Sequence, residues 1–110
     1  MEHRLKKNSQ FNFIYKNGER VHTENFCLFV VKSKYKDYKL GISISKKLGK
    51  ANKRNLLKRR IKEIARREID IPSFCNFVIL AKENSVCLTF IQLKEELIKL
   101  FKKYESKKNN

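Results

Sequence analysis

The chain has 110 residues, enough for one domain with a modest core and too few for a deep enclosed pocket. Apolar residues make up 41% and charged residues 35%, which is too apolar for a disordered tail and too charged for a membrane protein. The formal net charge of +16 exceeds the magnitude of about 2 to 8 that solubility requires in a small domain. This excess favours a polyanionic partner, with nucleic acid ahead of an acidic membrane surface.

The N-terminal part of the chain predicts one short helix. Residues 1–8 are expected to be loose, and no apolar run there resembles a signal peptide. A helix is expected over residues 9–17, where Phe11 and Tyr15 lie four positions apart and share one face. Gly18 is expected to end this helix with a positive φ, as glycine commonly does.

Alternating apolar residues predict the first strands. Residues 21–23 form a short strand, and residues 25–32 form a stronger one that places Phe29 on the face opposite Leu28. Residues 38–45 alternate between large apolar and small side chains. This alternation is typical of a sheet with one face on the core and one face more open.

The second half predicts a helix, a strand and a helix. The first of these helices spans residues 50–68, and Pro72 bars its continuation. Residues 76–82 are almost continuously apolar, as expected of a central strand. Thr89 and Gln92 form a T-x-x-Q capping box for the last helix.

The order α-β-β-β-α-β-α defines a single-domain α+β fold over residues 1–110. A helix between two successive strands implies that those strands are parallel within a mixed sheet. Residues 105–110 are expected to form a frayed tail. The longest apolar run, residues 26–31, is far shorter than the ~20 residues of a spanning helix, and the three cysteines show no pairing motif. A cytoplasmic location is therefore expected.

Positive charge is concentrated in residues 46–67, which hold eleven Lys or Arg and one acid, a net charge of +10. At about 100° per residue, an apolar stripe and a basic stripe separate on opposite sides of one helix. The apolar stripe, expected to pack on the sheet, consists of Leu57, Ile61, Ile64 and Ala65.

A solvated amphipathic helix is the simpler explanation, but it would need more acids, because like charges four residues apart repel. The pattern therefore favours a bound polyanion. RNA is preferred to DNA because a helix packed sideways on a sheet is not presented as a recognition helix. The residues expected to contact RNA are Lys46, Lys47, Lys50, Lys53, Arg54, Asn55, Lys58, Arg59, Lys62 and Arg66.

Residues 41–63 resemble the signature of the bacterial ribonuclease P protein subunit. In that family a strand and paired lysines are followed by a glycine-containing link and a helix with an R-N-R-x-K-R pattern. This sequence departs from the pattern at Leu56, where the family usually has a second arginine. The matching helix residues are Arg54, Asn55, Lys58 and Arg59. Residues 4–7 with Phe11 and Tyr15 resemble the family's N-terminal segment, so the resemblance covers nearly the whole chain.

The resemblance implies a four-stranded sheet with a left-handed crossover around the basic helix, against the general right-handed preference. It also implies that the chain joins a large catalytic RNA and helps it to remove the 5′ leader from precursor tRNA. The RNA would perform the chemistry with Mg²⁺, and the protein would bind no cofactor, membrane or small-molecule substrate. The residues expected to bind the leader are Phe11, Tyr15, Phe29, Lys6 and Lys7.

A structural RNA-binding protein, such as a ribosomal protein, is the alternative. It would share the basic helix, but its aromatic residues would lie in the core and would not line an open groove. A stand-alone nuclease is disfavoured because the sequence has no Ser/His/Asp set, Cys/His pair or acidic cluster. The isolated protein is thus expected to be inert, with no catalytic residues and no metal ligands.

Overall fold

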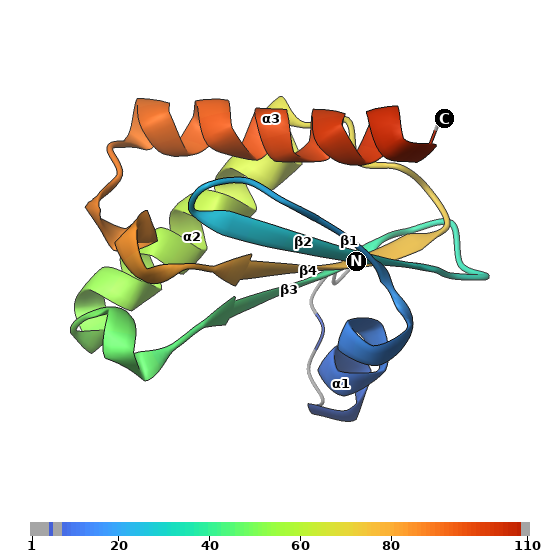
Figure 1. Cartoon of the computed structure of the whole chain (residues 1–110), viewed down its shortest axis with the longest axis horizontal. Coiled ribbons are helices and arrows are strands. Elements are labelled where there is room, and N and C mark those ends of the chain that lie inside the picture. Colours follow the sequence, from blue (N-terminus) through green and yellow to red (C-terminus); the bar gives the residue numbers. More distant parts are fainter. Residues whose placement is uncertain (1–4, 6–7, 109–110) are drawn as a thin grey trace.

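The computed structural model describes residue 5 and residues 8–108, and their ribbon is drawn in Figure 1. The expected order of helices and strands is confirmed, and short 3₁₀ helices flank α2 and β4. The elements are α1 (Asn8–Asn17), β1 (Glu19–His22), β2 (Phe26–Lys32), β3 (Lys39–Ile44), η1 (Lys46–Leu48), α2 (Ala51–Glu68), β4 (Cys75–Ala81), η2 (Glu83–Cys87) and α3 (Phe90–Lys108).

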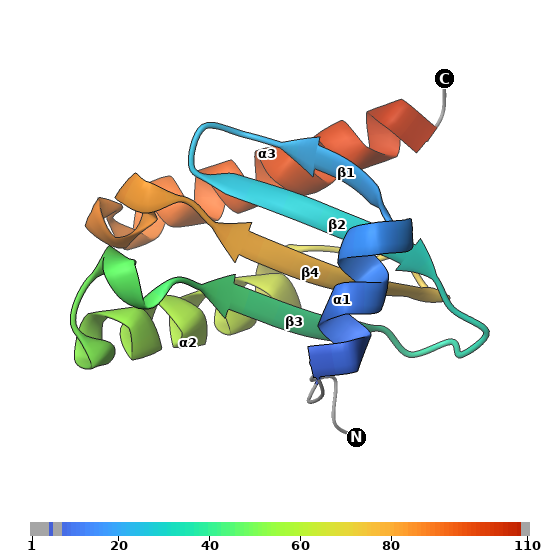
Figure 2. The same cartoon turned by 60° about the horizontal axis from the view of Figure 1, so that its bottom comes forward.

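The four strands form one mixed sheet in the order β1-β2-β4-β3. Strand β2 pairs antiparallel with β1 and β4, whereas β3 and β4 are parallel, which confirms the predicted pair around the basic helix. The almost continuously apolar β4 is central, as its sequence predicts. In Figure 2, β3 and β4 run the same way with α2 behind the sheet, so the β3–α2–β4 crossover is left-handed.

The sheet separates two layers of helices. Helices α2 and α3 cover one face, and of the described helices α1 lies on the other (Figure 1). The main core fills the space between the sheet and the helix pair, because alternate strand residues such as Leu28 and Ile79 point there and are fully buried. The stripes that face them also lie in this core: Leu57, Ile61, Ile64 and Ala65 of α2, and Leu93, Leu97, Leu100 and Phe101 of α3.

The start of α3 has the predicted capping box. The Thr89 backbone N–H donates to Gln92 Oε1 at 3.0 Å, and the Gln92 backbone N–H donates to Thr89 Oγ1 at 3.2 Å. One turn further, the Glu96 carboxylate accepts hydrogen bonds from Thr23 Oγ1, the Asn25 backbone N–H and the Asn25 side-chain amide. These bonds attach α3 to the turn between β1 and β2.

The expected frayed tail is wrong for residues 105–108, because α3 continues through Lys108. Tyr104 is buried and extends the apolar stripe of the helix by another turn. Lys107 Nζ donates to the Arg20 carbonyl of β1 at 3.1 Å. Both contacts hold the last turns against the sheet, whereas residues 109–110 lie outside the described part of the chain.

The expected loose N-terminal segment is wrong at Leu5 and Asn8. Leu5 is buried with Ile14 and Val78, and its backbone N–H donates to the Leu40 carbonyl at 3.3 Å. Asn8 is the first residue of α1. The apolar Leu5 side chain therefore packs on the sheet, and residues 1–4 and 6–7 lie outside the described residues.

Gly18 ends α1 for a different reason from the one expected. Positive φ values among the described residues occur at Gly49 and Phe74, and not at Gly18. A larger residue does not fit at position 18, because a Cβ there would lie 2.6 Å from the Ile14 carbonyl oxygen and 2.8 Å from the Val30 carbonyl oxygen. Both neighbours are backbone atoms, so they cannot rotate away as a side chain could.

Replacing Gly18 with alanine should destabilise the fold by about 1–3 kcal/mol, because α1 must move away from β2 to admit the methyl group. Urea denaturation of the two proteins measures this difference. Lys16→Ala, on the exposed side of the same helix, is the control and should leave the midpoint nearly unchanged. Equal midpoints for Gly18→Ala and the parent would contradict the close approach.

Candidate nucleic-acid interface

The basic helix α2 lies on the core through the stripe that the sequence predicts. The four residues of that stripe are at most 5% exposed, so the opposite side of the helix faces outward. On that side Asn55, Arg59 and Arg66 are exposed, and Lys58 and Lys62 are half-buried. The structure therefore places these five predicted RNA-binding residues on the side of α2 away from the core.

The link before α2 adds further positive charge. Lys46 and Lys47 lie exposed in η1, which Ser45 caps by accepting the Lys47 backbone N–H at 3.2 Å. Lys50 and Lys53 are exposed at the start of α2, and the half-buried Arg54 donates from Nε to the Gly49 carbonyl at 3.1 Å. Because a helix N-terminus also carries a partial positive charge, this end of α2 attracts anions.

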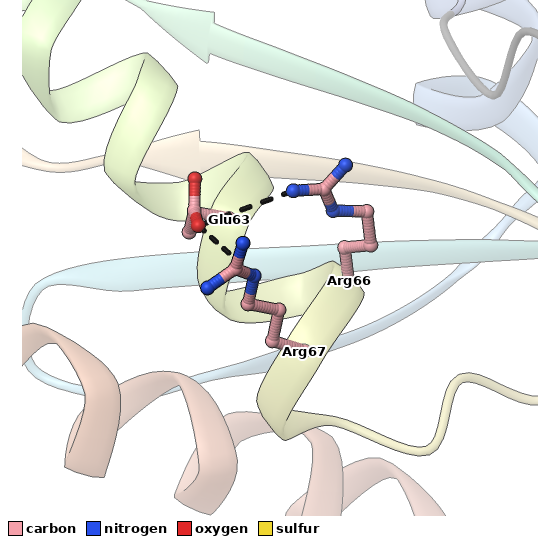
Figure 3. Close-up of polar contacts among 3 residues, drawn as sticks. All are labelled: Glu63, Arg66 and Arg67. Carbon is pink, nitrogen blue, oxygen red and sulfur yellow. Dashed lines mark ion pairs between the residues drawn. The ribbon is translucent and has the colours of Figure 1, made fainter.

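Glu63 offsets part of the charge at the other end of α2. Its Oε1 lies 3.1 Å from Arg67 Nε and 3.9 Å from Arg66 Nη2, as Figure 3 shows. Both arginine side chains remain about two-thirds exposed, so these surface ion pairs add little stability. The guanidinium groups therefore stay accessible to a phosphate, to which arginine donates two parallel hydrogen bonds.

A cluster of three aromatic rings lies on the other face of the sheet. The Tyr15 ring meets that of Phe29 edge-on at 4.9 Å between centroids, and the Phe11 ring is 6.5 Å from that of Tyr15. All three side chains are half-buried and pack against the small core of Leu5, Ile14 and Val78. Phe11 lies close to β3 because Gly41 has no side chain: a Cβ there would be 2.5 Å from Phe11 Cζ.

Helix α1 crosses this face at one end only, and among the described residues no other α-helix covers it (Figure 2). The next row beyond the aromatic cluster consists of Cys27, Leu80 and Ser43, which are in register across β2, β4 and β3. Burial raises the pKa of the Cys27 thiol, and the nearby charges of Arg20 and Lys82 oppose this shift. Cys27 is therefore a neutral thiol near pH 7, with two cations close by.

The basic helix lies on the face opposite the aromatic cluster, and the cluster reaches from Phe11 beside β3 to Phe29 on β2. Helix α2 extends past the β3 edge in Figure 2, and η1, with Lys46 and Lys47, follows directly after β3. A long ligand that passes this edge can contact both surfaces. Lys6 and Lys7, also expected at the aromatic cluster, lie outside the described residues.

Two exposed aromatic residues were not predicted from the sequence as binding residues. Phe13 is 57% exposed on α1, and Tyr35 is 64% exposed in the loop between β2 and β3. Phe13 falls outside the apolar stripe of α1, and only its exposure in the structure identifies it as a candidate binding residue. Within residue 5 and residues 8–108, no three His, Cys, Asp or Glu are grouped so that they could hold a metal ion. No helix in that part combines the length and apolarity needed to cross a bilayer.

The fold and its two surfaces define a small, strongly basic α+β protein whose outer charge suits an RNA partner. The family model described as Ribonuclease P matches residues 1–105. The chain belongs to the ribonuclease P protein family. It is therefore a component of a ribonucleoprotein endoribonuclease that acts in tRNA processing.

Individual relatives agree with this assignment. The ribonuclease P protein component of Finegoldia magna is 37% identical, over 96% of this chain and 93% of the relative. The Staphylococcus aureus RNase P protein structure has a TM-score of 0.86 at 32% identity and covers 93% of this chain and 94% of that one. The Thermotoga maritima protein has a TM-score of 0.83 at 31% identity, over 91% and 96% of the two chains.

Proposed function

We propose that the chain acts in the cytoplasm, holding the catalytic RNA of ribonuclease P through η1 and α2 and the 5′ leader of precursor tRNA through the aromatic cluster. The observation that carries the proposal is the orientation of α2, which buries one apolar stripe and turns its basic residues outward. Stability alone does not favour such a surface, because its like charges repel. A folded RNA supplies the phosphates that neutralise them.

The aromatic cluster suits a ligand of variable sequence. Different precursor tRNAs carry different leaders, so a protein that binds them all cannot rely on hydrogen bonds to particular base edges. Stacking serves every base, because each base has a π-face. The rings of Phe11, Tyr15 and Phe29 are half-buried where α1 packs on the sheet, and this partial exposure favours leader binding over a purely structural RNA-binding role.

The chemistry belongs, in this proposal, to the RNA partner and to Mg²⁺ bound by that RNA. The protein contributes binding and positioning, and the isolated chain is inert. A direct test adds the protein to ribonuclease P RNA at low magnesium concentration and measures 5′ maturation of precursor tRNA. The expected result is that cleavage is restored; cleavage by the protein without RNA would contradict the proposal.

Replacing Phe29 with alanine or leucine should weaken binding of precursor tRNA to the holoenzyme and leave mature tRNA binding unchanged. Removing one stacking partner costs about 1–3 kcal/mol per base, which corresponds to a loss of about 5-fold or more in affinity. Phe29→Leu keeps apolar packing on the sheet while it removes the ring, so it separates stacking from stability.

Equilibrium binding of the two tRNAs measures the effect. Phe90→Ala, which removes an aromatic ring that is 41% exposed on α3, is the control and should bind both tRNAs normally. Equal losses for precursor and mature tRNA in the Phe29 variants would reject the assignment of the leader to this cluster.

A further inference from the structure

A second aromatic and basic surface lies on the other flank of α1. A cavity of about 420 Å³ separates α1 from the loop between β2 and β3. Phe13 and Tyr35 both line it, and they are among the most exposed large apolar side chains described. Figure 2 shows this loop on one side of α1 and the strands that α1 does not cross on the other.

The charge around the cavity is positive. Lys32, Lys34 and Lys39 line it together with one acid, Asp37. Lys34 Nζ lies 5.4 Å from the centroid of the Tyr35 ring, within the range of a cation–π contact. A ligand that places a flat apolar group on the ring therefore brings its negative charge next to an ammonium group. Unpaired nucleotides have this combination of a base and a phosphate.

The loop that carries Tyr35 is held in place by backbone hydrogen bonds. The Ser33 N–H donates to the Phe74 carbonyl at 2.8 Å, and the Phe74 N–H donates to the Lys36 carbonyl at 3.2 Å. The Tyr35 N–H donates to Ser33 Oγ at 3.2 Å. Phe74 has a φ of 60°, a strained conformation for a residue with a side chain, and such strain persists where surrounding contacts fix it. Tyr35 is thus presented in a defined position, which lowers the entropy cost of binding.

We propose that Phe13, Tyr35 and the lysines around them form a second site for single-stranded RNA, which takes leader nucleotides farther from the cleavage site than those on the Phe11–Tyr15–Phe29 cluster. The proposal rests on the proposed function. Helix α1, about 10 Å across, separates the two sites, so a leader reaches the second one within a few nucleotides. A duplex does not fit this role, because its base faces are covered by their neighbours.

The experiment compares three RNAs on the reconstituted holoenzyme: mature tRNA, precursor tRNA with a leader of two or three nucleotides, and precursor tRNA with a leader of about ten. The parent protein should bind the long leader more tightly than the short one. In the Phe13→Ala, Tyr35→Ala double variant this gain should disappear, with a loss of about 5-fold or more for the long leader alone. Both side chains are mostly exposed, so the variant keeps the core.

Lys34→Gln is a second variant and should reduce the same gain, because it removes the cation beside the ring. Phe90→Ala is the matched control, because Phe90 is an exposed aromatic residue outside the cavity. This variant should still bind the long leader more tightly than the short one. A double variant that binds the long leader as well as the parent overturns the inference, and so does an equal loss for all three RNAs. If Phe29→Ala still weakens binding of the precursor tRNA with the short leader, the proposed function stands without the second site. If Phe29→Ala has no effect on that binding, the proposed function fails.

Discussion

Replacing Ile61 with alanine should lower the free energy of unfolding by about 2–5 kcal/mol. Ile61 is fully buried in the core between the sheet and the helix pair α2–α3. Truncation removes its apolar contacts and leaves a cavity that the packed neighbours fill only in part. Because small domains are stable by about 5–15 kcal/mol in total, this single change should remove a large part of the stability.

Chemical denaturation monitored by circular dichroism measures the loss. Arg59→Ala is the matched control, since it lies two residues away on the exposed side of α2 and should change stability by less than about 0.5 kcal/mol. The two variants should therefore separate stability from binding: Ile61→Ala unfolds more easily, and Arg59→Ala binds RNA more weakly. An unchanged denaturation midpoint for Ile61→Ala would show that α2 does not pack through this stripe.

Raising the salt concentration from about 50 to about 200 mM should weaken binding to ribonuclease P RNA by about 250-fold, if the basic surface contacts about five phosphates. Each neutralised phosphate releases condensed counterions, so the logarithm of the affinity falls linearly with the logarithm of salt concentration. About five contacts give a slope of roughly −4. The net charge of +10 over residues 46–67 provides enough cations for this number.

Arg59→Ala should reduce that slope by about one, because one phosphate contact is lost. Lys102→Ala makes the same change of charge on an exposed residue of α3, outside the predicted RNA-binding residues, and should leave the slope nearly unchanged. Titrations at several salt concentrations measure both slopes. An affinity independent of salt would reject the phosphate contacts. Equal changes of slope in Arg59→Ala and Lys102→Ala would show that these contacts are not made by α2.

Sequence reasoning succeeded where one local periodicity decides the outcome. The 3.6-residue repeat in α2 determines which side is apolar, so the burial of Leu57 and Ile61 and the exposure of Arg59 were predictable from spacing alone. The period-two pattern of the strands placed Phe29 on the face opposite Leu28 in the same way. The capping box at Thr89 was equally predictable, because both of its hydrogen bonds join residues three positions apart.

Tertiary structure decided the features that depend on contacts between distant segments. Gly18 is required by the approach of the Val30 carbonyl on a neighbouring strand, which no local pattern reveals. The last turns of α3 are ordered by Lys107 bonding to Arg20, 87 residues earlier in the chain. Phe11 and Tyr15 share a helix face in the sequence, but only the packing of α1 on the sheet brings Phe29 to them and leaves Phe13 exposed. The sequence by itself thus determined the elements and the faces that they present, whereas long-range packing determined which of those faces meet and which remain open to a ligand.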